Sequence, residues 1–174
     1  MSQMILKLRL LMAVVAGLAI LAAGYGCAGS ASTSTRAARI DMVCEVFPAA
    51  VELVEVMADG EAEGRSGMAV VNEVRSSSNL LGYLVETRVT GRSGPFKIAV
   101  LLDERLIVKR ATVVSYPWPR GREVGKRSFT RQFEGKGPED PIEIGKDIDA
   151  VTGATISCRA MATGVREAIE LLAD

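Results

Sequence analysis

The sequence contains no histidine, only three cysteines and few aromatic residues. Without histidine, the chain has no imidazole to act as a general base, a metal ligand or part of a C-x-x-C-H haem attachment site. Three cysteines that form no C-x-x-C pair do not supply the four thiolates of an ordinary iron–sulfur cluster. No G-x-G-x-x-G follows a predicted strand, so a nicotinamide site of the Rossmann type is unsupported. The formal net charge is zero, which gives no argument for binding nucleic acid.

The chain begins with an apolar segment that positive charges precede. Lys7 and Arg9 stand before an uncharged stretch whose apolar part, Leu10 to Ala28, is close to the roughly 20 residues that span a bilayer. Basic residues before such a segment predict a cytoplasmic N-terminus. We therefore predict that residues 1–30 form a membrane anchor or signal segment. The expected location is the inner membrane, with one span and the following domain on the periplasmic side.

Two alternatives for this segment stay open. A cleaved signal peptide also has a short apolar core followed by small residues. A lipoprotein would be attached through Cys27, although the preceding Gly24-Tyr25-Gly26 resembles a lipobox poorly. All three interpretations place the rest of the chain outside the cytoplasm.

Residues 31–66 are predicted to form a linker and short helices. The polar stretch at 28–35 is rich in serine and threonine, as flexible linkers are. Apolar residues at helical spacing follow, and we predict two short helices that Pro48 separates, the second ending at Asp59-Gly60. These apolar positions are Ile40, Val43, Phe47, Val51, Val54 and Met57.

From residue 67 the pattern changes to strands joined by short turns. Alternating apolar and polar residues, with turn residues between them, predict four strands, at 68–75, 81–90, 96–102 and 106–116. Consecutive strands with short turns favour an antiparallel meander. The last segment of the chain predicts a helix, because its apolar residues share one helical face. These are Met161, Val165, Ala168, Ile169 and Leu172.

The predicted fold class is therefore α+β: an N-terminal transmembrane helix, then an antiparallel β-meander packed with helices, in a domain at 67–174. A short motif precedes the last helix, where residues 149–155 read Asp-Ala-Val-Thr-Gly-Ala-Thr. The free N–H groups and positive dipole of a helix start favour an anion, and Gly153 and Ala154 keep bulk away from the backbone. A simpler interpretation is that a hydroxyl caps the helix, from Thr152, Thr155 or Ser157.

The order Asp-x-x-Thr-Gly-Ala-Thr resembles the flavinylation motif of the FMN-binding domain family. That family includes the FMN-carrying subunits of the Rnf-type ferredoxin oxidoreductase and the sodium-pumping NADH:quinone reductase. In the family, the last Thr of the motif holds FMN covalently through its phosphate, and a separate magnesium-dependent flavin transferase makes the bond from FAD. The resemblance covers about residues 67–172 and includes the Gly82-Tyr83 pair, the turn at Gly94 and the hairpin at Asp103.

The resemblance implies a covalent FMN on Thr155, with Thr152, Gly153, Ala154 and Asp149 shaping the cofactor site. It also implies redox partner proteins in or at the membrane and no catalytic residue, because an esterified hydroxyl is only a tether. Flavin fits the composition, since the missing histidine and sparse cysteine exclude other redox centres. Asp149 would serve recognition or local geometry, and a solvated loop carboxylate is the alternative.

The loop before the motif is strongly charged. Residues 117–131 hold five basic residues and one acidic residue, a net charge of +4, whereas residues 132–149 hold six acidic and two basic residues, a net charge of −4. Arg120 and Arg122 could neutralise the FMN phosphate, stabilise the reduced ring or dock a partner. Alternatively the loop is solvated and balanced by the acidic stretch. Trp118 would stack on the flavin or act as a packing residue.

The loop lacks the Glu-Thr-Pro-Gly stretch of the Rnf and sodium-pump subunits and looks closer to stand-alone or NosR-like members of the family. The leading hypothesis is therefore a membrane-anchored extracytoplasmic electron carrier. A Rnf-type subunit, a non-redox anchored binding or scaffold domain, and a small flavoenzyme with its own acceptor are the alternatives. The absence of an evident acid–base pair favours a carrier over an enzyme.

Two cysteines suggest further interpretations. Cys158 falls in the first turn of the last helix, where a thiol pKa can be lowered, or it is a small packing residue. Cys44 and Cys158 would be able to form a disulfide in an oxidising compartment if the fold brought them together.

Overall fold

The computed structural model describes residues 39–50, 52–59 and 69–173, which fall in one compact unit of the chain. The predicted anchor or signal segment at residues 1–30 and the linker at 28–35 lie outside the described residues. Among the helices that the structure describes, none is both long and apolar enough to cross a membrane.

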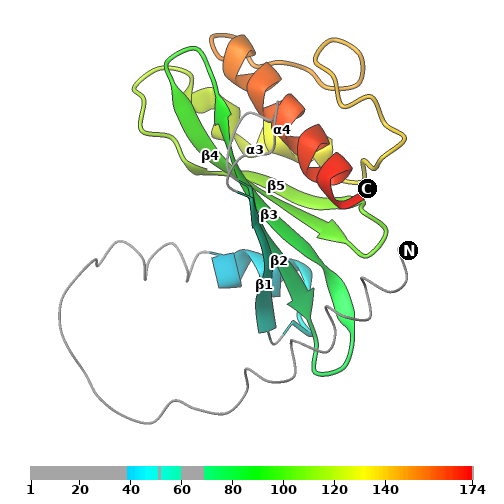
Figure 1. Cartoon of the computed structure of the whole chain (residues 1–174). Coiled ribbons are helices and arrows are strands. Elements are labelled where there is room, and N and C mark those ends of the chain that lie inside the picture. The colour runs from blue at the N-terminus through cyan, green and yellow to red at the C-terminus, as the bar shows by residue number, and fades with distance from the viewer. Residues whose placement is uncertain (1–38, 51, 60–68, 174) are drawn as a thin grey trace, which may run out of the picture. The chain divides into compact units, whose positions relative to one another are not determined.

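A five-stranded antiparallel sheet in the order β1-β2-β3-β4-β5 forms the centre of the fold (Figure 1). Each strand pairs with its neighbour in sequence, so the sheet is a simple meander. The predicted α+β class and meander are confirmed, and the four predicted strands lie within two residues of the observed ones. The strands are β1 Glu52–Asp59, β2 Ala69–Arg75, β3 Leu80–Thr90, β4 Pro95–Asp103 and β5 Val108–Ser115.

Both faces of β4 are buried, because alternate side chains of a strand point to opposite faces. Phe96, Ile98 and Val100 belong to the larger apolar cluster, together with the last helix. Ala99 and Leu101 belong to a smaller cluster on the other face. The alternation that predicted the strand therefore also divides the core into two parts.

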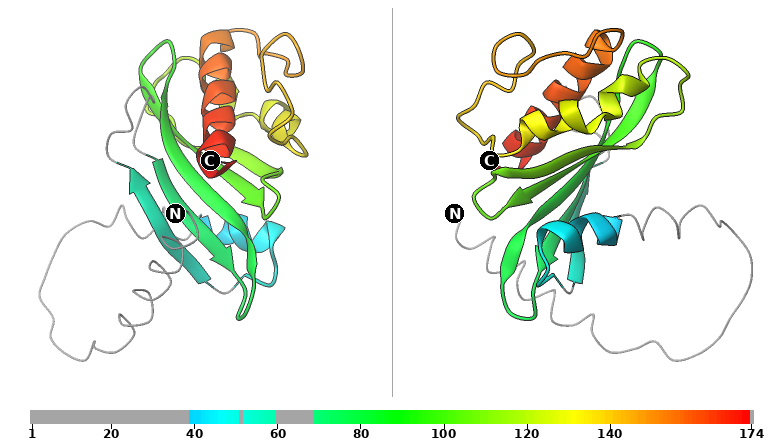
Figure 2. Two further views of the ribbon diagram at one scale, coloured as in Figure 1. Left: turned by 45° about the vertical axis from the view of Figure 1, so that its right-hand side comes forward. Right: turned by 180° about the vertical axis from the view of Figure 1, so that it is seen from behind.

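The long C-terminal helix α4, Thr155–Ala173, covers the larger cluster (Figure 2). It lies close to the sheet at Gly164, where a Cβ atom would be 2.4 Å from Val89 Cγ1 and 2.9 Å from Ile98 Cδ1. Three short helices add to this side: η1 Arg122–Gly125, α3 Arg127–Thr130 and η2 Arg131–Phe133. Phe129 and Phe133 from these helices stack edge to face, with ring centroids 5.3 Å apart, within the same cluster.

A helix at residues 39–46 covers the opposite face through Met42 and Val43, as the pattern before Pro48 predicted. The second predicted short helix is wrong, because residues 52–59 form β1. The spacing of Val51, Val54 and Met57 suits a helix, but an isolated helix this short is marginal in water. Pairing with the open edge of β2 gives the same residues ladder hydrogen bonds, and the register shift between Glu55 and Met57 absorbs the irregular pattern.

A tight turn around Asp147 leads the chain from the short helices toward α4. The Asp147 carboxylate accepts hydrogen bonds from the N–H groups of Ile142 and Glu143, at 3.2 and 2.8 Å, and pairs with Lys136 Nζ at 2.8 Å. These contacts hold Ile142 at a φ of +44°, which is rare for a β-branched residue. Partial burial opposes the charge, but the lysine and the N–H groups outweigh it and lower the pKa of Asp147 below its ordinary 3.8.

Replacing Gly164 tests the close packing of α4. Alanine normally stabilises a helix relative to glycine by about 0.5–1 kcal/mol, but here its Cβ would overlap Val89 and Ile98. We expect Gly164→Ala to lower the free energy of unfolding by about 1–3 kcal/mol, measured by urea denaturation. The exposed neighbour Thr163 supplies the control, since Thr163→Ala should change it by less than about 0.5 kcal/mol. A stabilised Gly164→Ala variant would contradict the packing.

Asp147→Asn tests the turn that precedes α4. A carboxyl with a lowered pKa in the folded state stabilises that state above its unfolded pKa and loses this effect as the pH falls. At neutral pH we expect the variant to be less stable by about 1–2 kcal/mol. The difference between wild type and variant should shrink as the pH falls below 3.8. Urea titrations across that range measure it, and a difference independent of pH would show that the charge is unimportant.

Candidate functional site

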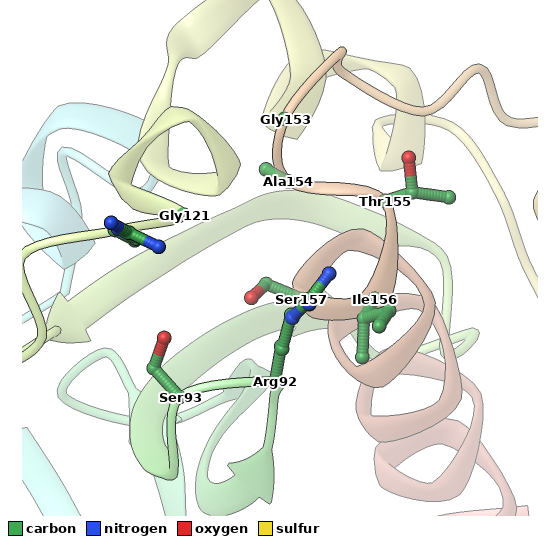
Figure 3. A pocket seen from close by; sticks show the side chains of 9 residues that line it. Arg92, Ser93, Gly121, Gly153, Ala154, Thr155, Ile156 and Ser157 are labelled. Atoms are coloured by element: carbon green, nitrogen blue, oxygen red, sulfur yellow. The ribbon is translucent and has the colours of Figure 1, made fainter.

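A cleft of about 490 Å³ opens where the start of α4 meets the turn between β3 and β4 and the loop after β5 (Figure 3). This volume lies within the roughly 300–1,000 Å³ typical of small-molecule sites. The motif before α4 therefore forms one wall of a cleft rather than a flat surface. The lining residues are Arg92, Ser93, Arg120, Gly121, Gly153, Ala154, Thr155, Ile156 and Ser157.

The first turn of α4 presents unpaired backbone donors. Ala154 precedes the helix, and its carbonyl accepts the N–H of Cys158 at 2.8 Å. Within the described residues, the backbone N–H groups of Thr155 and Ile156 have no acceptor. The side-chain hydroxyls of Thr152 and Thr155 have no hydrogen-bond partner there either. These threonines therefore do not cap α4, so the simpler interpretation of the motif fails for both. An uncapped helix start is a ready site for an anion.

Gly153 supplies the conformation that turns the chain into α4. Its φ is +85°, a left-handed value that other residues adopt only with strain. A Cβ at this position would meet nothing within 4 Å, so the glycine is needed for backbone geometry and not for space. Ala154 is 3% exposed and packs into the apolar core. The Ala154 side chain is thus taken up by the core, while Ala154 still contributes to the cleft lining.

A hydrogen-bonded chain fastens the loop after β5 to the first turn of α4. The Tyr116 hydroxyl donates to the Arg120 carbonyl at 2.9 Å and lies 3.0 Å from the Ser157 hydroxyl. Because tyrosine has a single O–H hydrogen, Ser157 must be the donor in the second contact. Ser157 is 2% exposed, and the Tyr116 ring packs against Phe96 with centroids 5.0 Å apart. This arrangement fixes Arg120 beside the helix start.

Glycines let the two loops come close to Ser157. A Cβ at Gly121 would be 2.4 Å from the Tyr116 hydroxyl, and a Cβ at Gly91 would be 2.7 Å from the Ser157 hydroxyl. Gly121 also has a φ of +89°. Larger residues at these positions would push the β3–β4 turn and the loop away from α4.

Trp118 packs on the β3–β4 turn and does not line the cleft. Its indole Nε1 donates to the Pro95 carbonyl at 2.8 Å, and a Cβ at Gly94 would lie 2.2 Å from the Trp118 ring. These contacts match the interpretation of Trp118 as a packing residue. The tryptophan therefore attaches the basic loop to the β3–β4 turn.

Positive charge gathers around the cleft. Arg92 and Arg120 both line it, and neither forms an ion pair with any acid that the structure describes. Arg122 lies outside the lining, with its Nε donating to the Trp118 carbonyl at 3.3 Å. The acidic stretch neutralises Arg127, which pairs with Glu134 at 2.6 Å. The interpretation that acids balance the whole loop thus holds for Arg127 but not for the arginines of the cleft.

Half of the eight predicted site residues line the cleft, namely Thr155, Gly153, Ala154 and Arg120. Thr152, Asp149, Arg122 and Trp118 lie outside its lining. The Asp149 carboxylate is exposed, while its backbone N–H and carbonyl bind the Gln132 amide at 2.8 and 3.1 Å. This favours a geometric role for Asp149, through its backbone.

Sequence reasoning missed five lining residues, of which Ser157 was considered only as a helix cap: Arg92, Ser93, Gly121, Ile156 and Ser157. Figure 3 shows the Arg92 guanidinium beside Ile156 and Ser157. The sequence indicated a turn at Gly91–Pro95 but not its place beside the motif, because only the packing of α4 across β3 and β4 brings the two together. Ile156 is 46% exposed, unusually high for a large apolar side chain, and follows Thr155 directly.

The cysteines play no part in the cleft. Cys158 is fully buried in the core, so the interpretation as a small packing residue is confirmed, and burial raises the pKa of its thiol, contrary to the alternative of a lowered pKa. Cys44 is exposed on the helix at residues 39–46, which packs on the opposite face of the sheet. Both thiols are free, so the fold does not bring them together in the disulfide that the sequence left possible.

Comparison with models of protein families gives a match to the FMN-binding domain over residues 39–170. The matched range includes the helix at 39–46, all five strands and most of α4. It begins before the predicted domain boundary at residue 67. A comparison with curated proteins gives no match.

Proposed function

The chain belongs to the FMN-binding domain family, and from this premise we propose that it is an electron-transfer flavoprotein with FMN esterified to Thr155. Family membership supports FMN as the cofactor. The covalent bond, the membrane anchor and the extracytoplasmic location are parts of the proposal. Bound FMN supplies the one- and two-electron chemistry that the protein's own side chains lack.

The environment of Thr155 carries the proposal. Its side chain is exposed at the edge of the cleft, free of any hydrogen bond to the described protein, directly at the start of α4. A phosphate bound to this oxygen would lie at the start of α4, where the N–H groups of Thr155 and Ile156 are unpaired, in a cleft that two arginines also line. Those donors suit a phosphodiester, which keeps one negative charge. A threonine that served as a helix cap would not be free in this way.

The proposed attachment transfers the FMN part of FAD to the protein. The Thr155 oxygen bonds to the phosphorus of the FMN unit, the bond between the two phosphates of FAD breaks, and AMP leaves. The threonine proton passes to a base of the flavin transferase. Once esterified, Thr155 holds the cofactor and takes no further part in its chemistry. Arg92 and Arg120, whose backbone carbonyl accepts a hydrogen bond from Tyr116, would supply positive charge to the phosphate and to the reduced ring.

The proposed location rests on the N-terminal segment. Lys7 and Arg9 before the apolar stretch support a single span in the inner membrane, with the FMN domain on the periplasmic side. The divergent loop at 117–131 favours a stand-alone carrier over a subunit of a Rnf-type complex. A non-redox scaffold domain would leave the uncapped helix start and the arginine-lined cleft without a use. The proposed partners are a flavin transferase during maturation and redox proteins in or at the membrane.

Flavinylation of the full chain tests the attachment site. We expect the chain, co-expressed with a flavin transferase, to gain the mass of one FMN less one water and to show flavin absorbance. Thr155→Ala should abolish both. Thr152→Ala is the matched control, because Thr152 is equally exposed in the same motif but lies outside the cleft lining. Labelling that survives in Thr155→Ala, or a colourless wild-type protein, would refute the proposal.

The reduction potential tests the role of the arginines. Loss of a positive charge beside the flavin should favour the oxidised form, so we expect Arg92→Gln and Arg120→Gln each to lower the two-electron midpoint potential. The expected shift is about 20–65 mV, the equivalent of about 1–3 kcal/mol. Arg105→Gln, in the exposed β4–β5 turn, is the control and should leave the potential unchanged. Equal shifts in all three variants would show that the arginines act only through overall charge.

A further inference from the structure

Six basic residues lie at the end of the sheet where β3 turns into β4, and we call this end of the molecule the basic end. Two of them, Arg88 and Lys97, project from the face of the sheet opposite α4, because Lys97 alternates with Phe96 and Ile98 of the larger cluster. Residues 88–97 contain three of them and no acid, while residues 117–126 contain the other three and one acid, Glu123. The two segments lie side by side in Figures 1 and 2, held together by the bond from Trp118 to the Pro95 carbonyl. The members are Arg88, Arg92, Lys97, Arg120, Arg122 and Lys126.

The members of the basic end repel one another. Arg88 and Lys97 are exposed and stand directly opposite in the β3–β4 ladder, where like charges are destabilising. None of the six basic residues forms an ion pair with an acid in the described part of the chain. The surface thus keeps a concentration of positive charge that stability alone does not favour.

The acidic stretch at 132–149 is attached to the start of β5, the end of that strand that lies away from the basic end. Val108 exchanges hydrogen bonds with this stretch, donating to the Lys136 carbonyl and accepting from Gly135 N–H, both at 2.8 Å. Ser115, at the other end of β5, pairs with Lys97 in the basic end. The two lysines of the acidic stretch are themselves paired with its acids. Within the described part of the chain, these two segments of opposite charge are therefore attached at opposite ends of β5.

We propose that the basic end docks the acidic face of a redox-partner protein, which exchanges electrons with the flavin in the adjoining cleft. This inference rests on the proposed function and names the class of its partner. Arg92 and Arg120 belong to both the cleft and the basic end, so a partner attracted to this surface arrives at the cofactor. Charge of one sign around a site raises association rates and orients the approaching molecule.

The composition of the surface favours a protein over a membrane. A helix or loop that lies in a lipid surface needs a stripe of apolar side chains. Of the large apolar residues found exposed in the described structure, Ile156 lines the cleft, while Ile40 and Val56 lie on the helix at 39–46 and on β1. One exposed apolar side chain in a cleft that two arginines also line fits a small protein interface with a polar rim.

The dependence of the reoxidation rate on ionic strength provides a sharp test, because the net charge of the chain is zero. We would reduce the flavinylated full chain and measure its reoxidation by ferricyanide, a trianion, and by tris(phenanthroline)cobalt(III), a trication. Two ferricyanide ions take one electron each from one fully reduced FMN and become ferrocyanide, while two protons pass to solvent. From about 0.01 to 1 M salt, the ferricyanide rate should fall roughly tenfold and the cobalt rate should rise. FMN adds negative charge, so the flavinylated chain is negative overall. Net charge alone therefore predicts that added salt raises the ferricyanide rate and lowers the cobalt rate.

Matched charge reversals locate the effect. Lys126→Glu changes an exposed side chain of the basic end that follows η1, on the side of the sheet where α4 lies, and that is outside the cleft lining. Arg105→Glu makes the same change of charge in the exposed turn at the other end of β4. We expect Lys126→Glu to reduce the salt dependence of the ferricyanide rate severalfold and Arg105→Glu to leave it unchanged. Equal effects of both variants would overturn the proposal.

Protein acceptors complete the test. At low salt, an acidic c-type cytochrome should reoxidise the flavin at least about tenfold faster than a basic one, and the difference should vanish at high salt. Equal rates, or a preference for the basic cytochrome, would overturn the proposal. Inhibition of the reaction with the acidic cytochrome by phosphatidylglycerol vesicles would also overturn it, because that result would show that the basic end binds a membrane. These outcomes leave a flavinylated protein, whereas failure of the proposed function leaves no flavin on Thr155.

Discussion

The close contact of α4 with β3 and β4 at Gly164 determines where every part of the cleft lies. Because Gly164 contributes no side chain, α4 packs closely on the side chains of Val89 and Ile98 and begins beside the turn that joins β3 and β4. That position brings Ser157 within hydrogen-bond distance of Tyr116, which in turn fixes the loop after β5. The cleft is therefore a consequence of how one helix packs on a meander.

The electrostatics of the cleft follow from the same arrangement. The start of α4 offers N–H groups without a cap, and the two loops beside it each contribute one arginine. Acids that would neutralise these charges are used elsewhere, in the turn around Asp147 and in the pair of Arg127 with Glu134. Positive potential is concentrated at one end of a molecule whose net charge is zero.

Local patterns were sufficient for much of the fold and for half of the cleft. The alternation in β2 to β5, the apolar face of α4 and the motif at Thr155 are properties of short segments, so the sequence alone reveals them. Arg92 could not be found in this way, since only tertiary packing brings the β3–β4 turn to α4. The error at β1 has a similar cause, because the apolar spacing of residues 51–57 fits a short helix, and the open edge of β2 decides the outcome. The sequence alone left two roles open for Cys158, a reactive thiol or a packing residue, and only its burial decides between them.

The exposed position of Thr155 at the rim of an open cleft has a consequence for affinity. A tether holds its ligand at a high local concentration, so the surrounding site needs little binding energy of its own. Under the proposed attachment, the walls can consist of small and charged residues, with no aromatic cage and no deep enclosure. A shallow site of this kind would leave the edge of the cofactor open, so that electrons would pass to a neighbouring molecule on simple collision, without a gate that must first move aside.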